Sequence, residues 1–424
     1  MKIVHIDTHD CIGGAARAAY RLHDGLQRLG QDSRMFVATK VSQDPTVVRF
    51  EPSKKWEARL FRALRRARIT WAAGRKSDVS PLGHSMVSDD RSVYSAEPWD
   101  QCPEADLIHF HWVASFVDYR AFFRLLSKST PLVWTLHDMN PFTGGCHYDT
   151  GCGRFREQCG VCPQLGSRKQ NDLSRQIWQR KQKAFRLLPK NCLHIVTPSK
   201  WLGEQLSQSS LLSQFPRSVI PNGLDTEVFQ PRNRRVMRDA LGISIHAKVL
   251  LFVADGANDP RKGLKLLTNA LKDSESHSEI VLLSLGSGKP DEFTRYPHIH
   301  VQTIQDDRLL SFVYSCADVF VAPSLQDNLP NTVLESMACG TPVVGFRAGG
   351  IPEAIHDGKT GLLAAVGNVE DLRRAVMEVL ERDQMREEMS QNCRRQVLEE
   401  YRLETQASRY LKLYQELLGK AETQ

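Results

Sequence analysis

Residues 323–342 read PSLQDNLPNTVLESMACGTP, and this stretch is the strongest indication of fold and ligand in the chain. A short loop ends at Pro330, and we expect a helix to begin near Asn331. The first amides of a helix lack intrahelical partners and, with the helix dipole, bind phosphate. Asp327 precedes the turn and Glu335 lies on the helix. Carboxylates accept hydrogen bonds from sugar hydroxyls, as in dinucleotide sites. An acid on each side of a phosphate-binding turn therefore indicates a nucleotide-sugar.

The same stretch can be interpreted as a buried helix that Gly340 closes and a strand follows from Pro342. Helix caps and buried strands are common. This interpretation leaves unexplained why an acid stands on each side of the turn, so we favour the ligand interpretation.

Size and composition indicate a two-domain protein. The 424 residues exceed what one hydrophobic core usually covers. With 41% hydrophobic and 25% charged residues, no apolar run approaches the ~18 residues that span a bilayer. The start, MKIVHIDTHD, contains no secretory h-region. We therefore expect a cytoplasmic protein whose cysteines are mostly reduced.

The positive charge is concentrated in residues 54–76, which carry nine basic residues and one acid, 9 − 1 = +8 against +7 for the whole chain. Trp56, Leu60 and Leu64 recur at spacings of four, which places them on one helical face. A basic amphipathic helix of this kind is typical of peripheral contact with an anionic membrane. The alternative is a solvated helix whose apolar stripe packs on its own domain. No base-reading motif supports a nucleic-acid partner.

Strands alternate with helices along the chain, which predicts an α/β fold with parallel, doubly wound sheets. The first unit is a strand over Lys2–Asp7, a loop with Gly13 and Gly14, and a helix to about Leu29. Further strands are predicted at 106–112, 132–136, 194–197, 249–254, 280–285, 300–303, 319–322 and 342–345. We expect an N-terminal domain (1–228, with a basic insertion at about 54–98), a nucleotide-sugar-binding domain (229–400), and a helix at 401–424 that packs back on the first domain. The two Rossmann-like domains are expected to face a shared cleft.

Several motifs occur in the order found in one family: the Gly-Gly loop, IPNGLDTEVF at 220–229, the pair Lys262-Gly263, PSLQDNLPNTVLE and ACGTPVV. With this set, the chain resembles the retaining glycosyltransferases of the GT-B fold, group 1 class, over nearly its whole length. The resemblance implies transfer of a hexose-type sugar from a nucleoside-diphosphate sugar to a glycan or lipid-linked glycan in polysaccharide biosynthesis. It also implies that catalysis needs no metal at the phosphates.

The resemblance implies a role for each donor-site residue. Glu335 would hold the ribose, and Asp327, where relatives usually have Glu, would contact the transferred sugar. Lys262 would bind phosphate, and Arg261 is a candidate replacement for an arginine that relatives carry where this chain has Gly256. The backbone amides of the turn would receive the diphosphate; the turn comprises Asn328, Leu329, Pro330, Asn331 and Thr332.

Three residues of the first half are also site candidates by resemblance. Gly14 would bring its backbone close to the phosphates. His137, in VWTLHD, would touch the transferred sugar, and the alternative is a histidine satisfied by Asp138 or a backbone carbonyl. His111, in HFHW, is a second candidate on the acceptor side.

Four cysteines crowd into GGCHYDTGCGRFREQCGVCPQLG at 144–166: Cys146, Cys152, Cys159 and Cys162. Thiols at this density in a cytosolic protein favour a structural zinc site, with paired disulfides as the alternative and His147 as an alternative ligand. A subgroup of the family associated with surface polysaccharide synthesis carries a similar loop.

We expect a UDP-sugar donor, with a GDP-sugar as the alternative, and no nucleic-acid partner. Two rival functions remain open: a nucleotide-sugar 2-epimerase of the same fold, and a non-catalytic subunit that binds a nucleotide-sugar.

Overall fold

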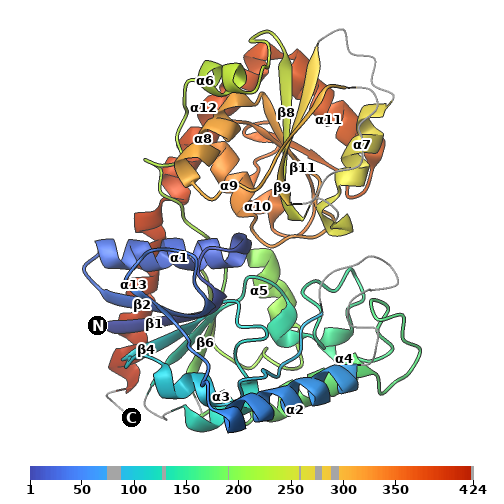
Figure 1. The fold of residues 1–424 in the computed structure, drawn as a ribbon. Coiled ribbons are helices and arrows are strands. Elements are labelled where there is room, and N and C mark those ends of the chain that lie inside the picture. The colour runs from blue at the N-terminus through green and yellow to red at the C-terminus, as the bar shows by residue number, and fades with distance from the viewer. Residues whose placement is uncertain are drawn as a thin grey trace. The chain divides into compact units, whose positions relative to one another are not determined.

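The computed structural model describes residues 1–73, 87–126, 130–189, 191–256, 259–272, 279–287 and 296–421, which form two compact units (Figure 1). Unit 1 contains Met1–Pro221 together with the chain from Gln406, and unit 2 contains Asn222–Thr405. The sequence prediction placed this boundary after residue 228. Arg75 and Lys76, the last two bases of the predicted basic segment, lie outside the described residues.

Unit 1 is built on a parallel sheet of seven strands in the order β3-β2-β1-β4-β5-β6-β7. The strands are β1 (Lys2–His9), β2 (Asp32–Thr39), β3 (Val47–Arg49), β4 (Leu107–Phe110), β5 (Leu132–Thr135), β6 (Leu193–Thr197) and β7 (Arg217–Val219). The helices are α1 (Gly13–Arg28), α2 (Trp56–Ala73), α3 (Tyr119–Leu125), α4 (Leu173–Phe185), α5 (Lys200–Ser207) and α13 (Leu403–Ala421), with short 3-10 turns η1 (Glu97–Gln101), η2 (Asn140–Phe142) and η3 (Arg154–Arg156).

The last helix, α13, completes the core of unit 1. Tyr410 and Tyr414 are fully buried in one apolar cluster with Ile3 and Leu107 of the central strands. Their hydroxyls also bond side chains of the sheet: Tyr410 Oη lies 2.8 Å from Thr135 Oγ1. Unit 1 therefore consists of two stretches of chain that are far apart in the sequence.

Unit 2 is a parallel sheet of six strands in the order β10-β9-β8-β11-β12-β13. The strands are β8 (Lys248–Gly256), β9 (Ile280–Ser287), β10 (His298–Val301), β11 (Val319–Ala322), β12 (Val343–Phe346) and β13 (Gly361–Ala364). The helices are α6 (Arg234–Ala240), α7 (Leu264–Lys272), α8 (Asp307–Cys316), α9 (Asn331–Ala338), α10 (Ile351–Ala354), α11 (Val369–Glu381) and α12 (Asp383–Glu400), with the 3-10 turn η4 (Pro260–Lys262).

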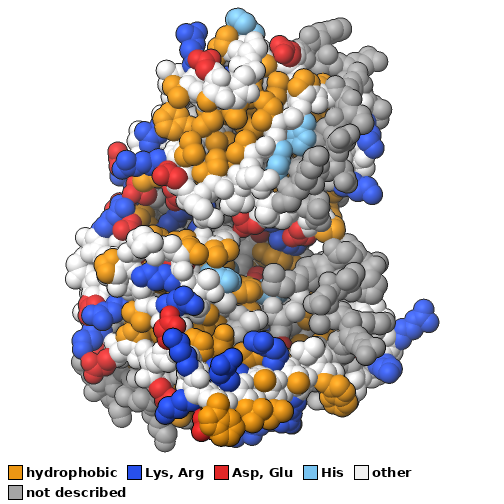
Figure 2. All heavy atoms as spheres, viewed as in Figure 1, with side chains coloured by type: hydrophobic (Ala, Val, Ile, Leu, Met, Phe, Trp, Pro, Cys, Tyr) orange, Lys and Arg blue, Asp and Glu red, His pale blue; other side chains and the backbone are white. Residues whose placement is uncertain are grey.

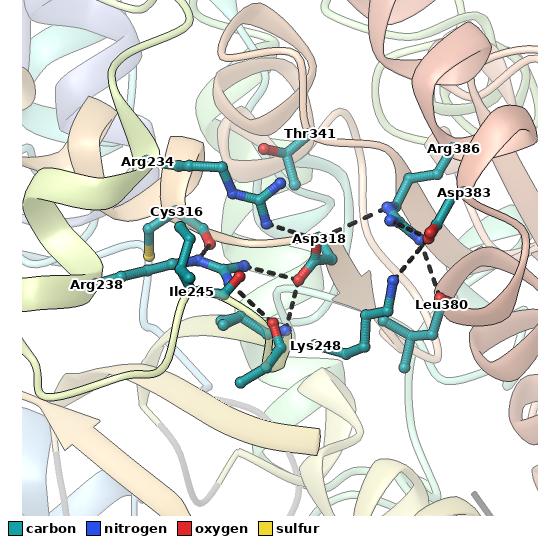
Figure 3. A network of polar contacts seen from close by, with 12 residues as sticks. Arg234, Arg238, Ile245, Lys248, Cys316, Asp318, Thr341, Leu380, Asp383 and Arg386 are labelled. Atoms are coloured by element: carbon teal, nitrogen blue, oxygen red, sulfur yellow. Dashed lines mark hydrogen bonds and ion pairs between the residues drawn. The ribbon is translucent and has the colours of Figure 1, made fainter. Parts of the chain in front are cut away.

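A charge network around the buried carboxylate of Asp318 fixes the start of β11 (Figure 3). Asp318 accepts hydrogen bonds from Arg234 Nη2 at 2.6 Å, Arg238 Nη2 at 2.8 Å and the Val249 amide at 2.7 Å. Burial alone would raise the pKa of Asp318, but the charges of Arg234 and Arg238 and the bond from Val249 hold that pKa below its usual value. The network thus ties β11 to β8 and α6 just before the loop that carries the candidate donor site.

The predicted α/β fold class with two Rossmann-like sheets is confirmed. One element was wrong: the helical tail from Val369 towards Leu418 is three helices, which break at Arg382 and near Tyr401. The predicted cap of that tail is present, since the Asn368 side chain accepts a bond from the Asp371 amide at 3.0 Å. Among the described residues, no helix is both long and apolar enough to span a membrane.

Candidate active site

The candidate donor site of unit 2 begins where β11 ends. Its loop leads into α9, which begins at Asn331 as the sequence predicts. Pro330 occupies the N-cap position and contributes no side-chain cap. Asn331 and Thr332 in the first turn are half-buried. The first turn of α9 is therefore left to backbone amides, the groups that bind an anion at a helix start.

The turn that carries Lys262 is packed tightly on this loop. Gly263 has φ +75°, and a Cβ there would stand 1.9 Å from the carbonyl oxygen of Pro323. The Leu325 amide donates to the Arg261 carbonyl at 2.8 Å. Only glycine allows this approach, which explains the Lys-Gly pair in the sequence.

Asp327 and Lys262 form the closest charged pair of this site. Lys262 Nζ lies 2.6 Å from Asp327 Oδ2, and Arg261 Nη1 lies 3.3 Å from the same oxygen. Arg261 also donates to the Gln326 carbonyl at 2.9 Å and pairs with Asp259 at 3.2 Å. Arg261 thereby holds the loop in shape, while Lys262 contributes a half-buried ammonium beside Asp327.

Glu335 lies on α9 and is buried, with 3% of its surface exposed. Tyr314 of α8 donates its hydroxyl to Glu335 Oε2 at 2.9 Å. Asn222 donates to Asn331 Oδ1 at 3.0 Å, which ties the helix start to the beginning of unit 2. Tyr314 and Asn222 are supporting residues that the sequence did not reveal, because 21 and 109 positions separate them from their partners.

The candidates of unit 1 lie at the carboxyl ends of its strands. Gly14 is exposed in the first turn of α1, which Gly13 opens with φ +86°. The β1–α1 loop is held by Asp10, which is buried and accepts bonds from the Val41 amide at 3.0 Å and the Ser42 amide at 2.8 Å.

Three histidines form a hydrogen-bonded chain across the sheet. His5 Nδ1 lies 2.9 Å from His111 Nε2, and His111 Nδ1 lies 3.1 Å from His137 Nε2. Burial lowers the pKa of His137 to about 4, and it also lowers the pKa values of His5 and His111 well below their usual value. All three imidazoles are therefore neutral near pH 7, so each contact joins one N–H to one lone pair.

The histidine at one end of this hydrogen-bonded series, His5, indicates in which direction the protons are donated. His5 Nε2 is buried without a hydrogen-bond partner. If the protons pointed towards His5, this atom would be a buried N–H with no acceptor, which is rare in proteins. We infer that His5 and His111 donate towards His137. His137 then accepts at Nε2 and carries its proton on Nδ1.

His5, His109 and His111 have ligand atoms within 4.8 Å of one another, as a metal site requires. However, His109 Nε2 lies 2.8 Å from Thr135 Oγ1, and its Nδ1 lies 2.6 Å from Tyr414 Oη. A divalent cation there would break these bonds and bury charge without a carboxylate in the group. The geometry fits a polar core network better than a metal centre.

Asp138 is hydrogen-bonded to a neighbouring histidine, His147. Asp138 Oδ2 lies 2.6 Å from His147 Nδ1 and accepts from Trp112 Nε1 at 3.0 Å. Burial would raise the pKa of Asp138, but the charge and hydrogen bond of His147 keep that pKa below its usual value. The other nitrogen of His147 lies 2.8 Å from Ser88 Oγ. Both ring nitrogens of His147 are therefore engaged, so His147 could ligate zinc only by giving up one of these contacts.

All four cysteines of the 144–166 loop line one small cavity of about 20 Å³. The cavity is tightly built, since a Cβ on Gly144 would stand 2.7 Å from Cys159 Cβ. The cysteines are free thiols in this structure, so the alternative of paired disulfides is not observed. In the described part of the chain, the one group of three ligand atoms within 4.8 Å is the histidine set above. The sulfurs therefore surround a common space but lie farther apart than in a closed metal site.

Family comparison agrees with this geometry. Residues 12–228, just over half of the chain, match the family described as Glycosyltransferase Family 4. The chain belongs to glycosyltransferase family 4. Within unit 2, residues 247–382 of this family 4 protein match the description Glycosyl transferases group 1.

Curated relatives match part of the family 4 protein. It is 36% identical over 183 residues to the sulfoquinovosyl transferase SQD2 of Arabidopsis thaliana, covering 42% of this chain and 35% of the relative. It is 33% identical over 201 residues to the D-inositol 3-phosphate glycosyltransferase of Geodermatophilus obscurus, covering 42% of each. The chain thus spans about two fifths of the length of these relatives.

Solved structures show that this family 4 protein has the GT-B fold. Sucrose-phosphate synthase from Thermosynechococcus elongatus has a TM-score of 0.66 at 17% identity and covers 99% of this chain and 100% of its own. Anabaena HepE in complex with UDP-glucose has a TM-score of 0.65 at 16% identity and covers 97% of this chain and 99% of its own.

Proposed function

We propose that the protein is a retaining glycosyltransferase that moves a hexose-type sugar from a nucleoside diphosphate to a glycan or lipid-linked glycan in polysaccharide biosynthesis. One observation carries the proposal: the Lys262 ammonium, 2.6 Å from Asp327, lies in the turn packed on the loop that opens α9, whose buried face bears Glu335. A cation, helix-start amides and two carboxylates suit a ligand with phosphate between two sets of hydroxyls.

Each group of the site has a part in this reaction. The amides of 328–332 and Lys262 take the diphosphate and stabilise the charge that grows on it as the sugar leaves. Glu335 accepts from the ribose, and Asp327 accepts from the transferred sugar. Gly14 approaches the phosphates, and His137 donates to a sugar hydroxyl.

Retention follows if the acceptor hydroxyl attacks from the face that the diphosphate leaves. The bond from the anomeric carbon to the phosphate oxygen breaks, and the bond to the acceptor oxygen forms. The departing phosphate takes the acceptor's proton, so no protein nucleophile is needed.

The proposed donor is a UDP-sugar, because Anabaena HepE, which shares the fold, was solved with UDP and with UDP-glucose. A thermal-shift screen of UDP-, GDP- and ADP-sugars tests this. A ligand that binds only the native state raises the free energy of unfolding by about 2.7 kcal/mol at a hundredfold excess over Kd, and the melting temperature rises as a result. The largest rise in melting temperature is expected with a UDP-sugar. A larger rise with a GDP-sugar would assign the GDP-sugar as the donor instead.

Two substitutions test the chemistry. Glu335→Ala should weaken UDP binding about tenfold or more, since a hydrogen bond to a charged group contributes about 1.5–3 kcal/mol. Asp327→Ala should abolish transfer and largely keep nucleotide affinity. Wild-type turnover in both variants would refute the proposal, and release of a free sugar epimer without acceptor would assign the protein as a 2-epimerase.

The proposal extends to a structural zinc held by the four cysteines around the 144–166 cavity. Tetrahedral Zn–S bonds of about 2.3 Å place the sulfurs about 3.8 Å apart, so the loop would close slightly around the ion. Protein purified without added zinc should contain about one zinc per chain by elemental analysis. Cys159→Ser should lose it, whereas Cys192→Ser, a buried cysteine outside the loop, should keep it. A ratio near zero in the wild type would end this part of the proposal.

A further inference from the structure

Helix α2 turns a face with two arginines towards the protein and exposes its large apolar side chains, whereas amphipathic helices usually bury the apolar face. Its partly buried positions, Ala58, Arg62, Arg65 and Ile69, recur at helical spacing and include two arginines. Its large apolar side chains are exposed: Trp56 by 70%, Leu60 by 50%, Leu64 by 64% and Trp71 by 82%. At 3.6 residues per turn, these four lie on one stripe opposite the arginines.

Ion pairs hold the inner face in place. Arg62 Nη1 donates to both carboxylate oxygens of Glu97, at 2.9 and 2.8 Å, and its Nη2 donates to the Ser53 carbonyl at 2.6 Å. Arg65 bonds the Ser92 carbonyl at 2.6 Å and pairs with Asp118. These contacts fix the rotation of the helix, so the apolar stripe cannot turn inward without breaking them.

Cations border the exposed stripe. The exposed basic side chains of this segment are Lys54, Lys55, Arg59, Arg66 and Arg68. In Figure 2, hydrophobic and basic side chains follow one another along the lower edge of unit 1, over α2. An exposed apolar ridge marks an interaction surface, and its basic border suits an anionic partner.

We propose that α2 is a membrane-docking helix that inserts Trp56, Leu60, Leu64 and Trp71 among the headgroups of an anionic phospholipid surface. Tryptophan and leucine on the buried side with lysine and arginine at the headgroup level are the pattern of interfacial helices. The exposure of the stripe contradicts the alternative sequence interpretation, in which the stripe packs on its own domain. This surface is separate from the donor site, so the inference does not depend on the proposed reaction.

Vesicle flotation of the full chain tests the proposal. We expect the protein to float with vesicles of phosphatidylglycerol and phosphatidylcholine, to stay behind with phosphatidylcholine alone, and to bind more weakly in high salt. The triple variant Trp56→Ser, Leu60→Ser and Leu64→Ser should lose at least about tenfold in vesicle affinity. A matched control, Val236→Ser with Leu309→Ser, removes two exposed apolar side chains of unit 2 and should bind as the wild type.

Because the substituted side chains are exposed, the triple variant should melt at the wild-type temperature and give the wild-type thermal shift with UDP. A second variant, Lys54→Glu with Lys55→Glu and Arg59→Glu, should lose binding to anionic vesicles while it keeps the apolar stripe. The proposal is overturned if the wild type does not float, or if the triple variant floats as well as the control. It is also overturned if light scattering shows a dimer that the triple variant makes monomeric while no vesicles are bound, since the stripe would then join two copies of this chain.

Discussion

The proton on His137 is set by residues that need not touch the substrate. In the chain His5–His111–His137, His111 donates to His137 Nε2, so His111 is a positioning residue. His111→Leu should lower kcat about tenfold, roughly the value of one hydrogen bond, with little change in the donor KM. His111→Asn places an N–H where Nδ1–H was and should restore part of the rate.

The pH profile of the same variants distinguishes positioning from a general loss of structure. Without the His111 donor, the Nε2 lone pair of His137 can more readily take up a proton, which should raise the pKa of His137. The acid limb of the kcat profile should therefore move to higher pH in His111→Leu and return in His111→Asn. An equal fall in kcat at every pH, with no rescue, would show that His111 only fills space.

The sequence predicted individual site residues but not the residues that form hydrogen bonds with them. His137 and His111 were chosen from motifs, but His5 was not, although it sits beside His109 in the β1–β4 register. The HFHW motif was the available signal, because alternate residues of a strand share a face. The bonds from Tyr314 to Glu335 and from Tyr414 to His109 had no such signal.

Among the elements, the turn at Gly263 offers a matched pair of substitutions. Gly263 and Gly358 both have positive φ, +75° and +76°, but only at Gly263 would a Cβ meet another atom within 4 Å. Each alanine variant should cost about 1 kcal/mol of backbone strain. Gly263→Ala should in addition weaken UDP binding, because the Lys262 turn must move away from Pro323. Calorimetric titration with UDP measures this, and equal affinity in both variants would contradict it.

The network at Asp318 should be a strong contributor to the stability of unit 2. Asp318→Ala leaves Arg238, which is fully buried, without a counter-charge, a change that typically costs about 3–5 kcal/mol. Asp383→Ala removes a carboxylate that is 72% exposed and should cost within about 0.5 kcal/mol. Urea unfolding followed by circular dichroism compares them.

Tryptophan fluorescence supplies an internal control for that experiment. All seven tryptophans precede residue 222, so their signal reports unit 1. Asp318→Ala should lower the urea midpoint measured by circular dichroism, which reports both units, more than the midpoint measured by tryptophan fluorescence. If the Asp318→Ala variant were as stable as Asp383→Ala, the network at Asp318 would be dispensable for stability.

Elements were predictable where the apolar pattern was unbroken. The strands expected at 132–136, 194–197, 280–285 and 319–322 agree with β5, β6, β9 and β11 to within two residues. The edge strands β3, β7 and β13 were missed, because three or four residues carry too little periodicity to identify a strand. The eight-residue strand β2 was missed as well, because its first three residues, Asp32, Ser33 and Arg34, are polar or charged. The breaks in the C-terminal helices were missed because neither proline nor glycine marks them.

For the whole molecule, unit 1 should be the acid-sensitive part. Burial lowers the pKa of six of its imidazoles: to about 4 for His23 and His137, well below the usual value for His5, His109 and His111, and below it for His9. Their unfolded pKa is about 6.5. Between pH 6.5 and 4 the unfolded chain takes up protons that the folded unit does not, so stability falls as pH falls.

Two carboxyls act in the opposite sense, since burial raises the pKa of Asp7 to about 8 and that of Asp90 to about 7. The six imidazoles outnumber these two carboxyls, so a net loss of stability is expected as the pH falls. Urea unfolding followed by tryptophan fluorescence should give a lower midpoint at pH 5 than at pH 7.5. An unchanged or higher midpoint at pH 5 would contradict this assignment.

The return of α13 to the first unit has a consequence for how the molecule is made. Unit 2 is one unbroken stretch and needs no part of the chain beyond Thr405 to complete its core. Unit 1 must wait for Tyr410 and Tyr414, because Thr135, His109 and the apolar faces of Ile3 and Leu107 are covered only when these arrive. A premature stop codon at position 406 would therefore yield a complete second unit attached to an unfinished first one.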